Sequence, residues 1–263
     1  MHHKRLIVAA IVVPLLYLYV MFLPAEYFLF LAVFVSTIAL IEFYAMFRIQ
    51  PALKYAAVAW GAVLLAVFFA ARHLFADMLL LAALTLMGLR LVVRRDPSSS
   101  REEISAVLMG LLYIPGLLTF QLDLVSWGPA WIVMLYVSVW VSDSMAYYIG
   151  KGFGKRKLYP EVSPNKTVAG GAGSLAGGVV GAVFVKSALL HQVPLLQSAL
   201  LGLSVGAASI VGDLVESMLK RDAGIKDSSN ILPGHGGMLD KLDSVTFAGP
   251  VFYWLGVGLG LLK

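Results

Sequence analysis

The sequence contains no cysteine. Disulfide bonds, thiolate nucleophiles and zinc sites built on thiolates are therefore excluded. Charge is also scarce, because Asp, Glu, Lys and Arg make up 13% of the 263 residues, against roughly a quarter in an average soluble domain. Hydrophobic residues make up 60%, which is more apolar surface than one soluble core of this length can bury, whereas a lipid bilayer can surround it. The composition therefore indicates an integral membrane protein.

Nine apolar stretches have about the 20-residue length that a helix needs to cross a bilayer. Basic residues precede the first stretch, but no small-residue cleavage site follows it, so we expect a retained helix rather than a secretory signal. The pattern predicts an all-α polytopic membrane protein with about nine transmembrane helices in a single integral membrane domain, residues 1–263. The expected spans are 6–23, 27–47, 55–71, 74–93, 104–122, 129–150, 168–190, 195–219 and 245–262.

The basic residues support this count of spans. If nine helices alternate in direction, all but three of the 20 Lys and Arg residues fall in connections on one side of the membrane. The exceptions are Arg72, Lys186 and Lys263. Because basic loops stay in the cytoplasm, the N-terminus is expected inside and the C-terminus outside. The net charge of +5 is thus explained by topology, and no nucleic-acid partner is expected.

Glycines recur at intervals of four residues in two late spans. One series is Gly173, Gly177 and Gly181, and the other is Gly202 and Gly206. Small residues at this spacing let helix backbones approach closely in lipid, so we interpret both series as packing faces. Such faces serve contacts within one chain or between two copies, which leaves a homodimer open.

Two long polar loops interrupt the apolar second half, at 150–167 and 217–244. Two predicted spans separate these loops, so both must emerge on the same side, the cytoplasm. We therefore expect them to build one site.

Acidic residues gather in and beside these loops. Asp240 and Asp243 are three positions apart, so a helix beginning near Gly237 would carry both on one face. Asp213 and Glu216 lie near the cytoplasmic end of one span, and Asp143 lies late in another, where an acid needs a polar cavity or a partner. Carboxylates without cysteine or clustered histidine suit Mg²⁺, which takes one or two of them together with substrate phosphates. The alternative is that these acids pair with neighbouring bases, namely Lys220, Arg221 and Lys241.

Two further pieces suit phosphate groups. The segment 233–237, Pro-Gly-His-Gly-Gly, offers flexible backbone amides, although it is not a P-loop and His235 is a lone histidine. The segment 163–167, Ser-Pro-Asn-Lys-Thr, places Lys166 and hydroxyls at the start of a span, where the helix dipole favours anions. A loop before a helix and simple N-capping are the structural alternatives for these two segments.

Taken together, the second loop resembles the signature of the phosphatidate cytidylyltransferases, also called CDP-diacylglycerol synthases. The resemblance extends over residues 138–246 and includes 142–147, 163–167 and 212–217. Two positions depart from the family pattern: Lys241 replaces the usual Arg, which keeps the charge but loses a bidentate fork, and Ala169 replaces a common Glu. The residues that carry the signature are Ser217, Lys220, Arg221, Lys226, Asp227, Pro233 to Gly237, Asp240, Asp243 and Ser244.

The resemblance implies that CTP and phosphatidic acid give CDP-diacylglycerol and pyrophosphate at the cytoplasmic face of a bacterial inner membrane, among membrane lipids. Residues 126–263 would be the catalytic half and 1–125 a set of lipid-embedded helices. Mg²⁺ would be held by Asp213, Asp240 and Asp243, and a second cation stays open. The remaining catalytic residues implied are Lys166, Lys220 and Arg221. The substrate-binding residues implied are Asp143, Ser163, Asn165, Thr167, Lys226, Asp227, His235, Gly236, Gly237 and Lys241.

Three other functions are weighed against this one. An ion-coupled transporter would place its acids near the bilayer midplane, whereas these cluster at cytoplasmic helix ends. A CTP-dependent polyprenol kinase or a CDP-archaeol synthase would share the metal and nucleotide features but act on another lipid.

Overall fold

The computed structural model describes residues 14–229 and 236–262 of the chain. Residues 6–13 of the first predicted span and His235 lie outside these residues, whereas 14–22 are helical. The helices group into two compact units. Unit 1 comprises Met1–Leu23, Asp123–Lys226 and Lys241–Lys263, and unit 2 comprises Pro24–Leu122 and Asp227–Asp240. The boundary at Leu122 lies close to the predicted division at residue 125, but the two-unit grouping does not test the prediction of a single domain.

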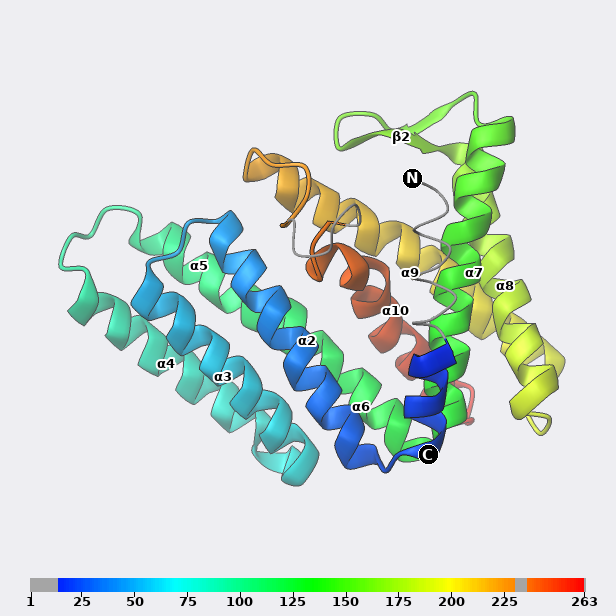
Figure 1. Cartoon of the computed structure of the whole chain (residues 1–263), viewed down its shortest axis with the longest axis horizontal. Coiled ribbons are helices and arrows are strands. Elements are labelled where there is room, and N and C mark those ends of the chain that lie inside the picture. The colour runs from blue at the N-terminus through cyan, green and yellow to red at the C-terminus, as the bar shows by residue number, and fades with distance from the viewer. Residues whose placement is uncertain (1–13, 230–235, 263) are drawn as a thin grey trace. The chain divides into compact units, whose positions relative to one another are not determined.

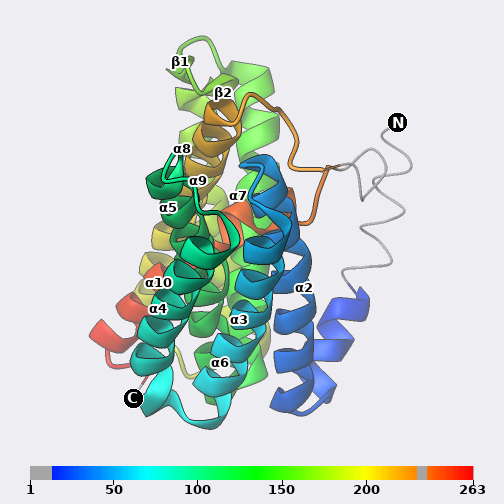
Figure 2. The same cartoon turned by 90° about the vertical axis from the view of Figure 1, so that its left-hand side faces the viewer.

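Unit 2 is a bundle of long apolar helices that run side by side (Figures 1 and 2). Two prolines shape this bundle. Pro51 is the first residue of α3 and follows the N-cap Gln50, whose side chain accepts the Leu53 N–H at 3.1 Å. Pro115 lies in a π-helical turn, because proline has no N–H to continue the α-helical hydrogen bonds. The elements are α2 (Ala25–Met46), α3 (Pro51–Ala70), η1 (Arg72–Leu74), α4 (Phe75–Val93), α5 (Ser100–Leu111), η2 (Leu112–Gly116) and α6 (Leu117–Trp127), whose last residues belong to unit 1.

Unit 1 is built on three long helices and a small hairpin at the end of the first (Figure 1). Its elements are α7 (Pro129–Phe153), β1 (Lys157–Tyr159), β2 (Ser163–Thr167), α8 (Val168–Leu189), α9 (Leu195–Asp222) and α10 (Leu239–Gly258), whose first two residues belong to unit 2. The antiparallel hairpin is a departure from the predicted all-helical chain. Residues 163–167 form a strand rather than the first turn of α8, which begins one residue later.

Glycines decide how closely α8 packs between its neighbours. A methyl group at Gly177 would lie 2.7 Å from the carbonyl oxygen of Val141 on α7. One at Gly206 on α9 would lie 2.6 Å from the carbonyl oxygen of Ser174 on α8. These separations leave no room for a side chain, so the interpretation of the glycine series as packing faces is confirmed.

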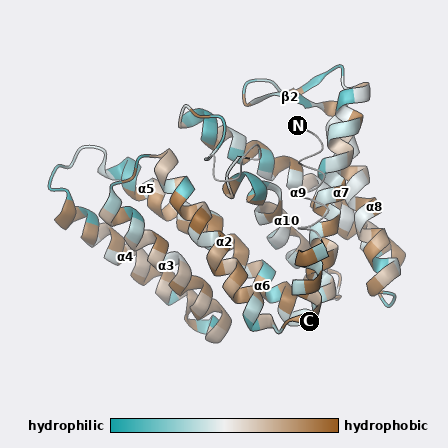
Figure 3. Ribbon diagram, in the orientation of Figure 1, coloured by the Kyte–Doolittle hydropathy of each residue, from teal (hydrophilic) through white to brown (hydrophobic). Residues whose placement is uncertain are grey.

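Seven helices of the described residues are long and apolar enough to cross a membrane. Figure 3 shows apolar residues along α2, α3 and α4 and polar residues at the hairpin and the loops. An almost wholly helical, polytopic membrane fold is therefore confirmed. The count of nine spans and the direction of the termini stay predictions, because residues 6–13 of the first span lie outside the described residues and α10 is not among the seven. The seven are α2, α3, η1 with α4, α5 with η2 and α6, α7, α8 and α9.

Candidate active site

The hairpin brings a lysine to the end of α9. Thr167 caps α8, since its hydroxyl oxygen accepts the Gly170 N–H at 3.1 Å. The capping alternative for this segment is therefore confirmed for Thr167. The preceding residue, Lys166, places its Nζ 2.6 Å from Oδ2 of Asp213, and both side chains stay partly exposed. The strand thus places the ammonium group of Lys166 beside Asp213 on α9.

A glycine brings α10 against α9 at the same level. A methyl group at Gly212 would clash with the Asp243 carbonyl oxygen and lie 2.9 Å from Cβ of Phe247. Because the backbones touch here, the neighbouring side chain of Asp213 lies within electrostatic reach of Asp243. The close approach of two helices therefore pairs two carboxylates that the sequence predicted to act together.

A third carboxylate comes from α7. Asp143 lies within electrostatic reach of Asp213, Asp243 and Lys166, and its side chain is hydrogen bonded to that of Ser244. We call Asp143, Asp213 and Asp243 the carboxylate cluster. Three acids from three helices repel one another, and Lys166 offsets only part of that repulsion. Such an arrangement suits a bound cation.

Glu216 and Lys220 extend this cluster along α9. Lys220 Nζ lies 3.2 Å from Oε1 of Glu216, and both side chains are buried. Glu216 also lies beside Asp243. The alternative in which an acid of this group pairs with Lys220 is thus observed for Glu216.

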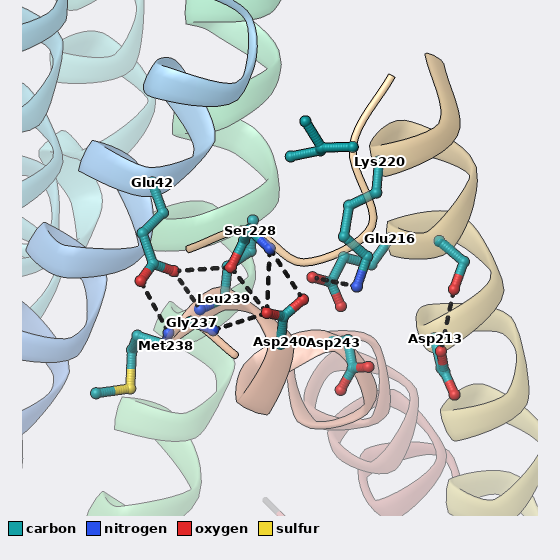
Figure 4. Close-up of polar contacts among 12 residues, drawn as sticks. Glu42, Asp213, Glu216, Lys220, Ser228, Gly237, Met238, Leu239, Asp240 and Asp243 are labelled. Carbon is teal, nitrogen blue, oxygen red and sulfur yellow. Dashed lines mark hydrogen bonds and ion pairs between the residues drawn. The ribbon is translucent and has the colours of Figure 1, made fainter. Parts of the chain in front are cut away.

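In unit 2, Asp240 organises the start of α10 (Figure 4). Its Oδ2 accepts the Gly237 N–H at 2.7 Å and both the N–H and the hydroxyl of Ser228 at 3.1 Å. On the other side of Ser228, the carboxylate of Glu42 from α2 faces the same loop. α10 begins at Leu239 and carries Asp240 and Asp243 three residues apart, so the prediction that one helix holds both acids is confirmed.

The two glycines before α10 are sterically required. Gly236 adopts a positive φ of 80°, which other residues rarely do. A methyl group there would clash with the Asp240 carboxylate. A methyl group at Gly237 would clash with the hydroxyl of Ser228 and lie 2.7 Å from Cδ of Glu42. Carboxylates therefore pack directly against the backbone of this segment.

The remaining predicted residues lie at or near the surface. Arg221 donates to the Val162 carbonyl at 3.3 Å and to the Ile225 carbonyl at 3.0 Å, so it joins the hairpin to the end of α9. Ser163 is half-buried in β2. The predicted substrate-binding residues with exposed side chains are Asn165, Lys226, Asp227 and Lys241. The binding and catalytic roles of all these residues stay predictions.

The donor chemistry of the carboxylate cluster fits Mg²⁺. No three Asp, Glu or His side chains among residues 14–229 and 236–262 converge closely enough to hold one ion by themselves. Mg²⁺ usually takes one or two carboxylates and completes its shell with substrate phosphates and water. Asp213 and Asp243 fit that requirement, whereas Asp240, the third predicted ligand, is hydrogen bonded to its own loop.

The sequence did not lead us to predict Glu42 as a partner of the segment that precedes α10. The signal was available, because Glu42 is an acid near the end of an otherwise apolar span and such residues are rarely retained without a partner. It went unnoticed because the signature residues lie far along the chain. Glu216 was noted only as an acid near the end of a span and Ser244 only as part of the signature, and neither was assigned a role.

Comparisons with known proteins show which family the chain resembles. The sequence model of the Cytidylyltransferase family matches residues 3–257. A phosphatidate cytidylyltransferase of Bacillus subtilis is 37% identical over 182 residues, covering 68% of the chain and 67% of that relative. The enzyme of the same name in Haemophilus influenzae is 38% identical over 193 residues, covering 67% of each chain. The one in Pseudomonas aeruginosa is 52% identical over 122 residues, covering 46% of the chain and 45% of that relative.

Proposed function

The chain belongs to the cytidylyltransferase family, and we propose that it transfers the cytidylyl group of CTP to phosphatidate, giving CDP-diacylglycerol and pyrophosphate. The relatives that carry the name phosphatidate cytidylyltransferase support this substrate pair. The membrane-spanning helices suit a lipid acceptor, which would diffuse to the site within the bilayer.

The reaction balances without an added base. A phosphate oxygen of phosphatidate attacks the α-phosphorus of CTP, the bond from that phosphorus to the bridging oxygen of the β-phosphate breaks, and pyrophosphate leaves. The attacking oxygen is already anionic, so no proton has to be removed from it. The barrier arises from bringing two anions together and from charge on the leaving group, and positioning and electrostatic stabilisation lower it.

The side chains of unit 1 supply that stabilisation. Lys166 would bind a phosphate oxygen while its ion pair with Asp213 holds it in place. Lys220, oriented by Glu216, would hold a second one. Mg²⁺ bound by Asp213 and Asp243 would neutralise negative charge on the triphosphate. Exposed Lys226 and Lys241 would attract CTP from the cytoplasm.

The observation that carries this proposal is the convergence of Asp143, Asp213, Asp243 and Lys166 in unit 1. They come from α7, α9, α10 and β2, four elements that are distant in sequence. A purely structural helix bundle has no need to gather three carboxylates and a lysine at one end, because their mutual repulsion destabilises the fold.

The test is a transfer assay with purified protein in detergent. CTP labelled in the cytosine ring or, in parallel reactions, at the γ-phosphate is supplied with phosphatidate, with a polyprenol or with an archaeol phosphate, each with Mg²⁺ or with a chelator. We expect labelled CDP-diacylglycerol only with phosphatidate and Mg²⁺. A labelled product from the archaeol lipid alone would identify a CDP-archaeol synthase. Phosphorylation of the polyprenol alone would identify a polyprenol kinase.

The orientation of the site is testable in cells. We propose that the carboxylate cluster faces the cytoplasm of a bacterial inner membrane, because both polar loops carry the excess of basic residues. Because the chain has no cysteine, a single introduced cysteine is the one thiol of this protein that a maleimide can label. A cysteine at exposed Asn165 should react with a membrane-impermeant maleimide only after the membrane is opened. Labelling in intact spheroplasts would place the site on the other face.

A further inference from the structure

Helix α2 contains a buried acid that the proposed chemistry does not use. Glu42 lies near the end of an apolar 22-residue helix and is 2% exposed. The other acid of α2, Glu26, lies exposed in the first turn. Burial of a carboxylate inside an apolar span is costly unless hydrogen bonds replace its lost water. The contacts of Glu42 therefore need an explanation.

Among the described residues, Glu42 accepts four hydrogen bonds, and all of them come from the segment that leads into α10 (Figure 4). Oε1 accepts the Ser229 hydroxyl at 2.6 Å and the Met238 N–H at 3.0 Å. Oε2 accepts the Ser228 hydroxyl at 3.1 Å and the Leu239 N–H at 2.8 Å. Each oxygen thus joins one serine before residues 230–235 to one backbone amide after them. A single carboxylate from the N-terminal half holds together two stretches of the signature loop.

Glu42 also acts on Asp240 through a shared donor. The Ser228 hydroxyl lies 3.1 Å from Oε2 of Glu42 and 3.1 Å from Oδ2 of Asp240. One hydroxyl carries one proton, so it donates to one carboxylate at a time. Because Glu42 also accepts the Leu239 amide at the start of α10, its negative charge stabilises the positive end of that helix dipole. The direction of the first turn of α10, which carries Asp240, therefore depends on Glu42.

We propose that Glu42 is a positioning residue for the nucleotide step: it holds residues 228–229 and 236–240 in the conformation that receives the phosphates of CTP. This inference rests on the proposed function. Glu42 itself touches neither substrate. Its carboxylate acts through the backbone amides at 237–239 and through the orientation of Asp240.

The experiment compares Glu42→Gln with the wild type and with Glu26→Gln, which removes the same charge from an exposed position on the same helix. A glutamine has one accepting oxygen, so its amide nitrogen faces either Met238 or Leu239 and loses a charge-assisted bond. We expect the KM and the Kd for CTP to rise by roughly ten- to a hundredfold, with the KM for phosphatidate unchanged. Amide hydrogen exchange of residues 236–240 should become faster in Glu42→Gln alone.

A scaffolding role predicts different results. If Glu42 only supports folding, the variant loses active molecules, so kcat falls while both KM values and the Kd for CTP stay at wild-type levels. That outcome overturns the proposal, as does faster exchange at 236–240 with unchanged CTP affinity. Ser229→Ala serves where Glu42→Gln does not fold, since it removes one donor and keeps the charge. It should raise the KM for CTP several-fold, and no change in that KM contradicts the proposal.

The measurements also separate this inference from the proposed function. If the wild-type protein binds CTP but forms no CDP-diacylglycerol from phosphatidate, the proposed lipid substrate is wrong. The Kd values for CTP then still decide the role of Glu42. If the wild-type protein does not bind CTP in the presence of Mg²⁺, both proposals fail.

Discussion

Lys166 on β2 and Asp213 on α9 form an ion pair with 2.6 Å between Nζ and Oδ2. The pair joins the first polar loop to the helix that leads into the second. Each partner stays partly exposed, so the pair itself contributes little to stability. The pair matters for the geometry of the site, because it places the ammonium group of Lys166 beside the carboxylate cluster.

Replacement of Lys166 should therefore impair catalysis more than stability. In Lys166→Met, three carboxylates lose the charge that faces them, and the phosphates lose a donor. We expect kcat/KM for CTP to fall by roughly a hundredfold or more, while the unfolding temperature changes little. Lys155→Ala, an exposed lysine just before the hairpin, is the matched control and should retain most activity. Equal losses in both variants would indicate a general effect of charge.

The two acids of α10 can be tested separately. Asp243→Asn removes a charge from the carboxylate cluster and should abolish formation of CDP-diacylglycerol in a protein that still folds. Asp240→Asn should also abolish it, but with faster amide exchange at Gly237 and Ser228, because Asp240 accepts their N–H groups. Asp77→Asn, an exposed acid at the start of α4, is the control. Full activity in both α10 variants would rule out their predicted role in metal binding.

The contact between α9 and α10 should be intolerant of a single methyl group. Gly212→Ala forces Cβ into the Asp243 carbonyl, and overpacking of this kind costs about 1–3 kcal/mol. We expect a lower unfolding temperature in detergent and a large loss of activity, because Asp213 and Asp243 are displaced together. Gly88→Ala on α4, where nothing lies within 4 Å of the added Cβ, is the control and should be neutral or stabilising. Unchanged activity in Gly212→Ala would contradict the close approach.

Lys241→Arg restores the residue that the family pattern has at this position. The side chain is exposed on the first turns of α10, so the larger guanidinium meets no steric barrier. Arginine keeps the charge and adds a bidentate fork for phosphate. We expect activity within about threefold of wild type for Lys241→Arg and a higher KM for CTP in Lys241→Ala. A collapse of activity in Lys241→Arg would show that the lysine has a specific role.

The class of fold could be predicted from composition and hydropathy alone. Seven of its nine apolar stretches correspond to described helices of spanning length, because the length and hydropathy of a segment decide whether it can cross a bilayer. The glycine series were also interpreted correctly, because a residue without a side chain permits close packing of helices wherever it lies. The signature also selected the helix ends at which Asp213 and Asp243 would act.

Which side chains meet depends on the packing of the helices and could not be predicted from the sequence. Ser163 to Thr167 form a strand because pairing with residues 157–159 overrides the tendency to extend α8. Asp240 faces the amides of its own loop, and the buried partner of that loop is Glu42, from the opposite end of the sequence. Spacing along a chain reports which residues share a helix face. It does not report which helix packs against that face, because that choice depends on side-chain volumes and backbone contacts summed over the whole bundle.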